Sequence, residues 1–323
     1  LSKGSGLALT GMCLSTFFSG RGLTKSVMLV NMAGAVMNIP LDYLLIFGKC
    51  GFPELGIRGA AYATCASWGV NFLLFALLVF RREHERCYLV RSAWRFDREL
   101  FLRFLRFGLP GGVQFAMDIL GFTLFLFVVG SLGAESLAAT NIVFSINGLV
   151  FLPMIGMSVA ASVLVGQAQG ARDPDRAVFA NMSALYVSLA YTLFLDFFLV
   201  FFPRELLALF RPQDISLEQF QAIQDTGVVL LRMVAVYCLF DAVGIIQYGS
   251  LRGAGDTRFV MLAMLATSLG ILVLPTWLMV RVLGWGLYPA WACVLTYIAG
   301  LAVILRLRFM RGAWRRLDRK SVV

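Results

Sequence analysis

The chain has 323 residues, of which 59% are hydrophobic and only 14% are charged. With a mean hydropathy of +0.81 it has too little polar surface for an ordinary soluble domain, and the composition predicts an integral membrane protein. The net charge of +10 does not indicate a nucleic-acid partner, because the arginines lie between apolar runs and not on one basic face.

The chain carries six scattered cysteines and a single histidine, His84. This pattern suggests neither a zinc site nor a disulfide framework, and most of the cysteines are expected to be small core residues. We therefore expect no cofactor.

Apolar runs of roughly 20 residues without strand-like alternation predict transmembrane helices and an all-α architecture. Residues 1–18 resemble the end of a helix whose beginning is missing, and the first residue is not Met, so an N-terminally truncated chain is expected. Two full helices, an arginine-rich linker and six further helices follow. Four parts are predicted: the end of a first lobe at 1–80, a linker at 81–106, a second lobe at 107–305 and a basic tail at 306–323. The two full spans of the first lobe are 26–47 and 59–80. The six spans of the second lobe are 107–132, 137–168, 178–202, 227–250, 259–282 and 285–305.

Lysine and arginine concentrate in alternate loops, including the linker and the tail. This bias predicts that the linker and the C-terminus are cytoplasmic, whereas the acidic stretch 203–226 is an external loop. We expect a multi-pass protein of a bacterial inner membrane, with the lipid bilayer as its surroundings.

A glycine-broken turn occurs twice along the chain. Residues 20–28 match residues 253–261 in two glycines, a threonine, a basic residue, a valine and a methionine. Residues 55–61 resemble 285–291 at nearly the same separation. Both copies enter from the cytoplasmic side, which predicts a parallel repeat of two six-helix halves.

Two carboxylates, Asp118 and Asp241, fall within predicted spans. Acids at bilayer depth are costly and usually functional. Gln114 lies one helical turn before Asp118, and Tyr237 one turn before Asp241, so each pair shares a helix face. Together the acids can hold a proton or, when ionised, a sodium ion. The alternative is that these acids are structural, with partners such as Asn141, Asn147 or a serine; Asp196 and Asp42 are weaker candidates.

The second turn is interpreted as structural. Glycines permit the tight bend, Asp256 or Thr257 caps the next helix, and the arginines keep the turn on the cytoplasmic side. Trp94 and Trp314 are expected to be interfacial anchors.

Over nearly all of its length the chain resembles the multidrug and toxic compound extrusion (MATE) transporters. The motifs that carry this resemblance are LRGAGDTR at 251–258 with its copy at 17–28, NIPLDYLLIFG at 38–48, PELGIRGAA at 53–61 and VGQAQGARDPDRA at 165–177. Each motif alone is weak, but together they are specific. The resemblance implies a two-lobe helical bundle.

The ion-coupled branch of that family places an acid eight residues after a Gly-x-Pro, and here Pro110 leads to Asp118. It also places an aspartate eleven residues before the turn arginine, with a tyrosine one turn earlier, as Asp241, Arg252 and Tyr237 are placed here. A family member has Glu where this chain has Asp118. The shorter side chain leaves the ion preference open.

The resemblance implies a monomeric secondary transporter, not an enzyme, that exchanges small organic and often cationic substrates for Na⁺ or H⁺. The alternatives are a lipid-linked oligosaccharide flippase, for which a basic cavity is expected, and a membrane-embedded enzyme, for which the spans hold no histidine constellation. The expected cation and substrate residues are Asp118, Asp241, Tyr237, Gln114 and Asn141, with Na⁺ at the first three, and the expected structural residues are Pro110, Arg252, Gly253, Gly255, Asp256 and Thr257.

Overall fold

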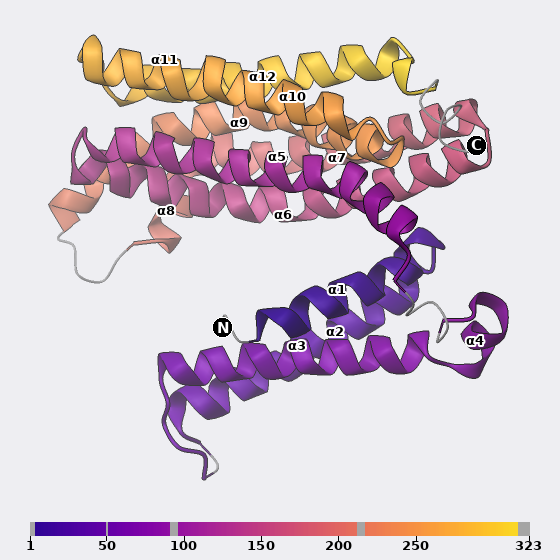
Figure 1. Ribbon diagram of the computed structural model, residues 1–323. Helices are drawn as coiled ribbons and strands as arrows, with labels where there is room; N and C mark the ends of the chain where they lie inside the picture. The colour runs from indigo at the N-terminus through magenta and orange to yellow at the C-terminus, as the bar shows by residue number, and fades with distance from the viewer. Residues whose placement is uncertain (1–3, 50, 91–95, 212–216, 316–323) are drawn as a thin grey trace. The chain divides into compact units, whose positions relative to one another are not determined.

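The structure is a computed structural model that describes residues 4–49, 51–90, 96–211 and 217–315, and the regular elements in these residues are all helices (Figure 1). Eight of these helices are long and apolar enough to cross a membrane. The predicted all-α membrane architecture is therefore confirmed. The chain divides into two compact units, unit 1 (Leu1–Phe101) and unit 2 (Leu102–Val323).

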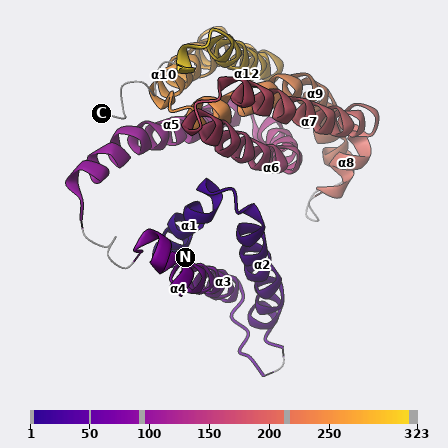
Figure 2. The same ribbon diagram turned by 90° about the vertical axis from the view of Figure 1, so that its right-hand side faces the viewer.

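Unit 1 is built on three long helices, of which α3 packs along both of the others (Figure 2). The α2–α3 contact is especially close, because a Cβ atom added at Gly59 would lie 2.3 Å from the backbone oxygen of Leu45. A proline, Pro40, lies inside α2. The helices of this unit are α1 (Ser5–Gly20), α2 (Thr24–Phe47), α3 (Ile57–Val79) and the short α4 (Arg82–Tyr88).

Helix α4 falls in the arginine-rich stretch that was predicted as a linker. The Phe17 ring of α1 meets the rings of His84 and Tyr88 at centroid distances of 5.3 and 5.5 Å. The guanidinium of Arg21 lies over the Tyr88 ring at 4.7 Å. The start of the linker is thus helical and packs against the end of α1. Residues 91–95, which include the predicted anchor Trp94, lie outside the described part.

In unit 2 the long helix α9 is central, because it packs against α6, α7 and α12. Its buried residues Leu230, Leu231 and Val234 belong to the largest apolar core of the chain. The bundle is visible from two directions in Figures 1 and 2. Its elements are α5 (Arg98–Gly130), which begins at the end of unit 1, α6 (Ala134–Gly170), α7 (Pro174–Phe201), α8 (Pro203–Leu209), α9 (Leu217–Gly253), α10 (Thr257–Thr267), α11 (Leu274–Trp277) between the π-helical segments η2 (Ser268–Val273) and η3 (Leu278–Val282), and α12 (Leu287–Met310).

Several helices run beyond the spans predicted for them. Helix α5 begins at Arg98, inside the predicted linker, and α9 begins at Leu217, ten residues before the predicted span at 227–250. The stretch predicted as an external loop also contains α8. Hydropathy identifies only the part of a helix that suits lipid, whereas the helical hydrogen bonds continue through polar residues.

Helices α6 and α9 meet through small residues spaced four apart. A Cβ atom at Gly249 would lie 2.3 Å from the Ser158 backbone oxygen, and one at Gly253 would lie 2.1 Å from that of Ser162. Such small-xxx-small patterns let membrane helices approach closely. This corrects the sequence interpretation of Gly253, which lies within α9 and serves packing. The tight bend belongs to Gly255, whose φ is +85°.

Candidate functional site

Asp118 projects from α5 into unit 2, where it is half-buried. Its Oδ1 accepts a hydrogen bond from the Tyr297 hydroxyl of α12 at 3.4 Å. Tyr297 is itself buried, with 3% of its surface exposed. The contact holds the carboxyl of one helix against a neutral donor on another.

Asp241 lies on the central helix α9 and is also half-buried. Its carboxyl is close enough to that of Asp118 for the two to interact electrostatically. Tyr297 interacts electrostatically with both acids. The structure thus brings Asp118 and Asp241 into one neighbourhood, which the sequence pattern placed on separate helices without fixing their relative position.

Tyr237, one turn before Asp241, is buried and also interacts electrostatically with it. Its ring stacks on that of Trp291 at a centroid distance of 6.5 Å and an interplanar angle of 18°. The Trp291 indole nitrogen donates to Thr140 Oγ1 at 3.3 Å. These contacts fix the Tyr237 ring in the bundle interior beside the acids.

Aromatic rings from three helices form an apolar wall beside the acids. Phe122 of α5 lies edge-on to Tyr297 at 6.4 Å, and Phe144 of α6 lies 5.1 Å from Trp291. A wall of this kind excludes water and strengthens electrostatic interactions between the carboxyls.

The other two predicted site residues, Gln114 and Asn141, differ in burial. Gln114 is buried, one turn before Asp118 on α5. Asn141 is exposed on α6, and no described contact joins it to either acid. The structure therefore places Gln114 on the same helix face as Asp118 but does not bring Asn141 to the carboxyls.

Tyr297 was not among the residues expected from the sequence. It is one of several aromatic residues in an apolar span, and its contact with Asp118 joins residues 179 apart along the chain. A tyrosine in the middle of a predicted span was the one available signal, since a buried phenol hydroxyl usually has a partner.

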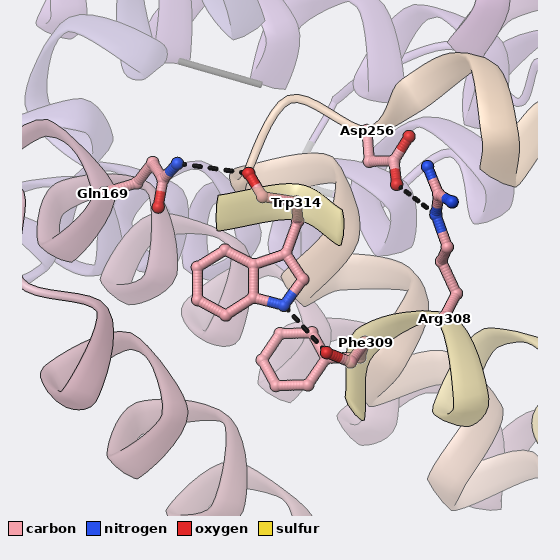
Figure 3. A network of polar contacts seen from close by, with 5 residues as sticks. All are labelled: Gln169, Asp256, Arg308, Phe309 and Trp314. Carbon is pink, nitrogen blue, oxygen red and sulfur yellow. Dashed lines mark hydrogen bonds and ion pairs between the residues drawn. The ribbon is translucent and has the colours of Figure 1, made fainter. Parts of the chain in front are cut away.

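The turn between α9 and α10 is held by contacts that differ from those expected (Figure 3). Asp256 occupies the N-cap position of α10, but its side chain makes no capping hydrogen bond. Instead its Oδ2 accepts from Arg308 Nε at 2.8 Å. Thr257, the other predicted cap, is the first residue of α10 and is buried.

Trp314 is fully buried, which corrects its assignment as an interfacial anchor. Its ring stacks on Phe309 at 5.1 Å, and its indole nitrogen donates to the Phe309 carbonyl at 2.9 Å. Gln169 of α6 donates to the Trp314 carbonyl at 3.3 Å. Figure 3 shows these contacts beside the Asp256–Arg308 pair. Residues at the end of α12 are therefore bonded both to α6 and to the turn before α10.

The remaining motif residues have structural contacts. Arg252 donates to the Tyr248 hydroxyl, one turn earlier on α9. Pro110 is buried inside α5. No described contact joins either residue to Asp118 or Asp241.

The oxygen donors at the acids suit a hard monovalent cation, because carboxylate and hydroxyl oxygens replace its water ligands. Among the described residues, no group of three or more His, Cys, Asp or Glu is arranged to hold a metal ion. Two carboxyls and two phenols suit a weakly held ion or a proton better than a tightly held metal.

Comparison with known proteins places this bundle in a family. The family model described as MatE matches residues 110–278, just over half of the chain. The chain belongs to the MATE family. This is a family of membrane transporters and not of enzymes, and the match agrees with the eight described helices that are long and apolar enough to cross a membrane.

Curated relatives and solved structures agree with the MATE assignment. The chain is 28% identical over 320 residues to the "Probable multidrug resistance protein NorM" of Thermotoga maritima, covering 98% of this chain and 66% of the relative. It is 30% identical over 312 residues to the protein of the same name from Rhizobium meliloti, covering 94% and 65%. The "Crystal structure of MATE in complex with MaL6" matches with a TM-score of 0.86 and 22% identity over 97% of this chain and 69% of that one. The chain thus spans about two thirds of these relatives and has the MATE fold.

Proposed function

We propose that this protein acts as a secondary active multidrug exporter that exchanges organic, often cationic, compounds for Na⁺ or H⁺. The observation that carries the proposal is the hydrogen bond from the buried Tyr297 of α12 to the Asp118 carboxyl, with Asp241 and the buried Tyr237 on α9, the helix against which α12 packs. The names of the curated relatives, which are multidrug resistance proteins, support the substrate class.

The mechanism follows from competition for the two carboxyls. A cationic substrate is stabilised by the acids while they are ionised. When a proton or Na⁺ occupies them, that attraction is lost and the substrate leaves. Because ion and substrate exclude one another, the movement of one down its gradient drives the other out. Tyr297 orients the Asp118 carboxyl without neutralising it, because a phenol is an uncharged donor.

A flippase for lipid-linked sugars requires cationic side chains to hold a pyrophosphate. The groups gathered at this site are acidic, which favours the exporter. We further propose that the protein resides in a bacterial inner membrane as a monomer, with its C-terminus in the cytoplasm.

The test uses the complete coding sequence that contains this chain, reconstituted into vesicles that carry either a sodium or a proton gradient. Efflux of a fluorescent organic cation is followed in the wild type, Asp118→Asn and Asp241→Asn. The matched control is Glu135→Gln, which removes an exposed acid at the start of α6. We expect ion-driven efflux to be lost in both aspartate variants and retained in the control. Wild-type efflux in both aspartate variants would contradict the coupling mechanism.

A further inference from the structure

Asp196 of α7 is a buried acid outside the pair described above. Only 7% of its surface is exposed. Both carboxyl oxygens are buried, and neither has a hydrogen-bond partner among the described residues. An ionised carboxylate is strongly disfavoured in such surroundings unless a cation or a proton accompanies it.

Asp196 ends a polar stripe on the buried face of α7. Ser188 and Thr192 precede it at intervals of four residues, and both are fully buried. Their spacing places all three side chains on one helix face over roughly 12 Å. Thr192 donates to the sulfur of Met154 at 3.4 Å, whereas Ser188 Oγ lacks a partner among the described residues. The oxygen atoms of Ser188 and Asp196 in this stripe are therefore buried and have no hydrogen-bond partner among the described residues.

The neighbouring face of α9 connects this acid to the candidate site. Asp196 interacts electrostatically with Tyr237 and Cys238. The same Tyr237 interacts with Asp241, one turn further along α9. Tyr237 and Cys238 thus each interact electrostatically with both Asp196 and Asp241.

No titratable side chain in the described part of the chain forms a hydrogen bond or ion pair with Asp196. Tyr191, on the same helix, interacts with Cys238. Arg204, just beyond the end of α7, is exposed and pairs with Asp225 at 2.9 Å. Arg232 of α9 is exposed as well.

We propose that Asp196 is a third residue that binds the coupling cation, H⁺ or Na⁺, and that Tyr237 links it to the Asp118–Asp241 pair. This inference rests on the proposed antiport and names a further residue of its ion site. In the proton form the carboxylate gains one H⁺ and becomes neutral. In the sodium form it stays ionised and balances one Na⁺ with the help of the Tyr237 hydroxyl. Either way, one positive charge binds at one carboxylate.

Infrared difference spectroscopy on the complete protein in lipid nanodiscs tests this directly. Spectra are recorded while the pH is raised in sodium-free buffer, and again at fixed pH when NaCl or choline chloride is added. The variants are Asp196→Asn, Asp196→Glu and the control Thr192→Val, which alters the same stripe without removing an acid.

We expect a protonated-carboxyl band that disappears as the pH rises, is absent in Asp196→Asn, is shifted in Asp196→Glu and persists in Thr192→Val. Proton release on the pH rise should fall by about one per protein in Asp196→Asn. Loss of the band on adding NaCl but not choline chloride would identify Na⁺ as a ligand, and equal spectra with both salts would identify H⁺ alone.

Two results would overturn the proposal. One is a wild-type spectrum and proton release in Asp196→Asn. The other is an Asp196 band that responds to neither pH nor Na⁺, because a permanently protonated structural acid gives that result. If Asp196→Asn does not fold, the test uses the pH midpoint at which the protonated-carboxyl band disappears in Asp196→Glu. A midpoint equal to that of the wild type counts against the proposal.

The binding measurement does not depend on transport. A titrating Asp196 in a protein without ion-driven efflux would refute the antiport and leave cation binding intact. Ion-driven efflux with an inert Asp196 would refute this inference alone.

Discussion

The hydroxyl of Tyr297 lies 3.4 Å from Oδ1 of Asp118 and joins α12 to α5. Because the hydroxyl is neutral, it can stabilise the ionised carboxylate without holding it as firmly as an arginine would. The acid is thus positioned yet remains able to exchange its ion. This relationship identifies Tyr297 as a positioning residue for the proposed ion site.

Replacement of Tyr297 by phenylalanine should weaken ion-driven efflux while the protein still folds. A hydrogen bond to a charged group contributes about 1.5–3 kcal/mol, so the ion concentration for half-maximal efflux should change by about tenfold or more. The control is Tyr288→Phe, on the same helix but exposed. An equal ion dependence in Tyr297→Phe and wild type would argue against the positioning role.

Gly253→Ala should destabilise the bundle. The new methyl group would lie 2.1 Å from the Ser162 backbone oxygen, so α6 and α9 must move apart, at a cost of about 1–3 kcal/mol. Thermal unfolding in detergent measures the effect. Gly156→Ala on α6 is the control, because a Cβ atom there has nothing within 4 Å. A melting temperature for Gly253→Ala as high as that of the control would refute the packing role.

Asp256→Asn should lower the free energy of unfolding by about 1–3 kcal/mol, because the charge-assisted bond to Arg308 is lost in a partly buried place. The side chain of Asp256 is only 6% exposed, whereas that of Arg308 is 29% exposed. The comparison is Asp225→Asn in the exposed pair with Arg204, where the loss should be at most about 1 kcal/mol. Equal effects of the two substitutions in denaturant unfolding would show that burial of the pair is unimportant.

Trp314→Ala should destabilise the end of unit 2 that holds the C-terminal end of α12 by about 3–5 kcal/mol, as expected for truncation of a fully buried aromatic residue. Trp314→Phe keeps a ring to stack on Phe309 and should cost less. Limited proteolysis near the end of α12 provides the readout, with faster cleavage in the alanine variant. Cleavage of Trp314→Ala at the wild-type rate would restore the interfacial interpretation.

Some features of the candidate site were evident in the sequence, and others were not. Asp118, Tyr237 and Asp241 could be selected because acids in apolar spans are rare, and because a spacing of four residues fixes a shared helix face. Tyr297 could not be selected in this way, since its importance depends on the packing of α12 against α5. The burial of Asp196 was likewise not evident from the sequence, because it depends on how the helices of unit 2 pack.

The roles of residues in the turn between α9 and α10 were equally dependent on tertiary structure. Local rules correctly placed Asp256 at a helix start and a glycine bend before it. They assigned Asp256 to capping, however, and its side chain instead pairs with Arg308 from α12. The rules also assigned Gly253 to the bend, whereas its missing side chain is needed for contact with α6.

The sequence by itself determined the all-α class and eight candidate membrane spans, because bilayer thickness and helix geometry act on contiguous residues. It also determined which acids lie in apolar segments. Only the tertiary structure decided which side chains meet: Tyr297 with Asp118, Arg308 with Asp256 and the small residues of α6 with those of α9. These contacts join residues far apart in the chain, and packing, not local pattern, sets the distance between them.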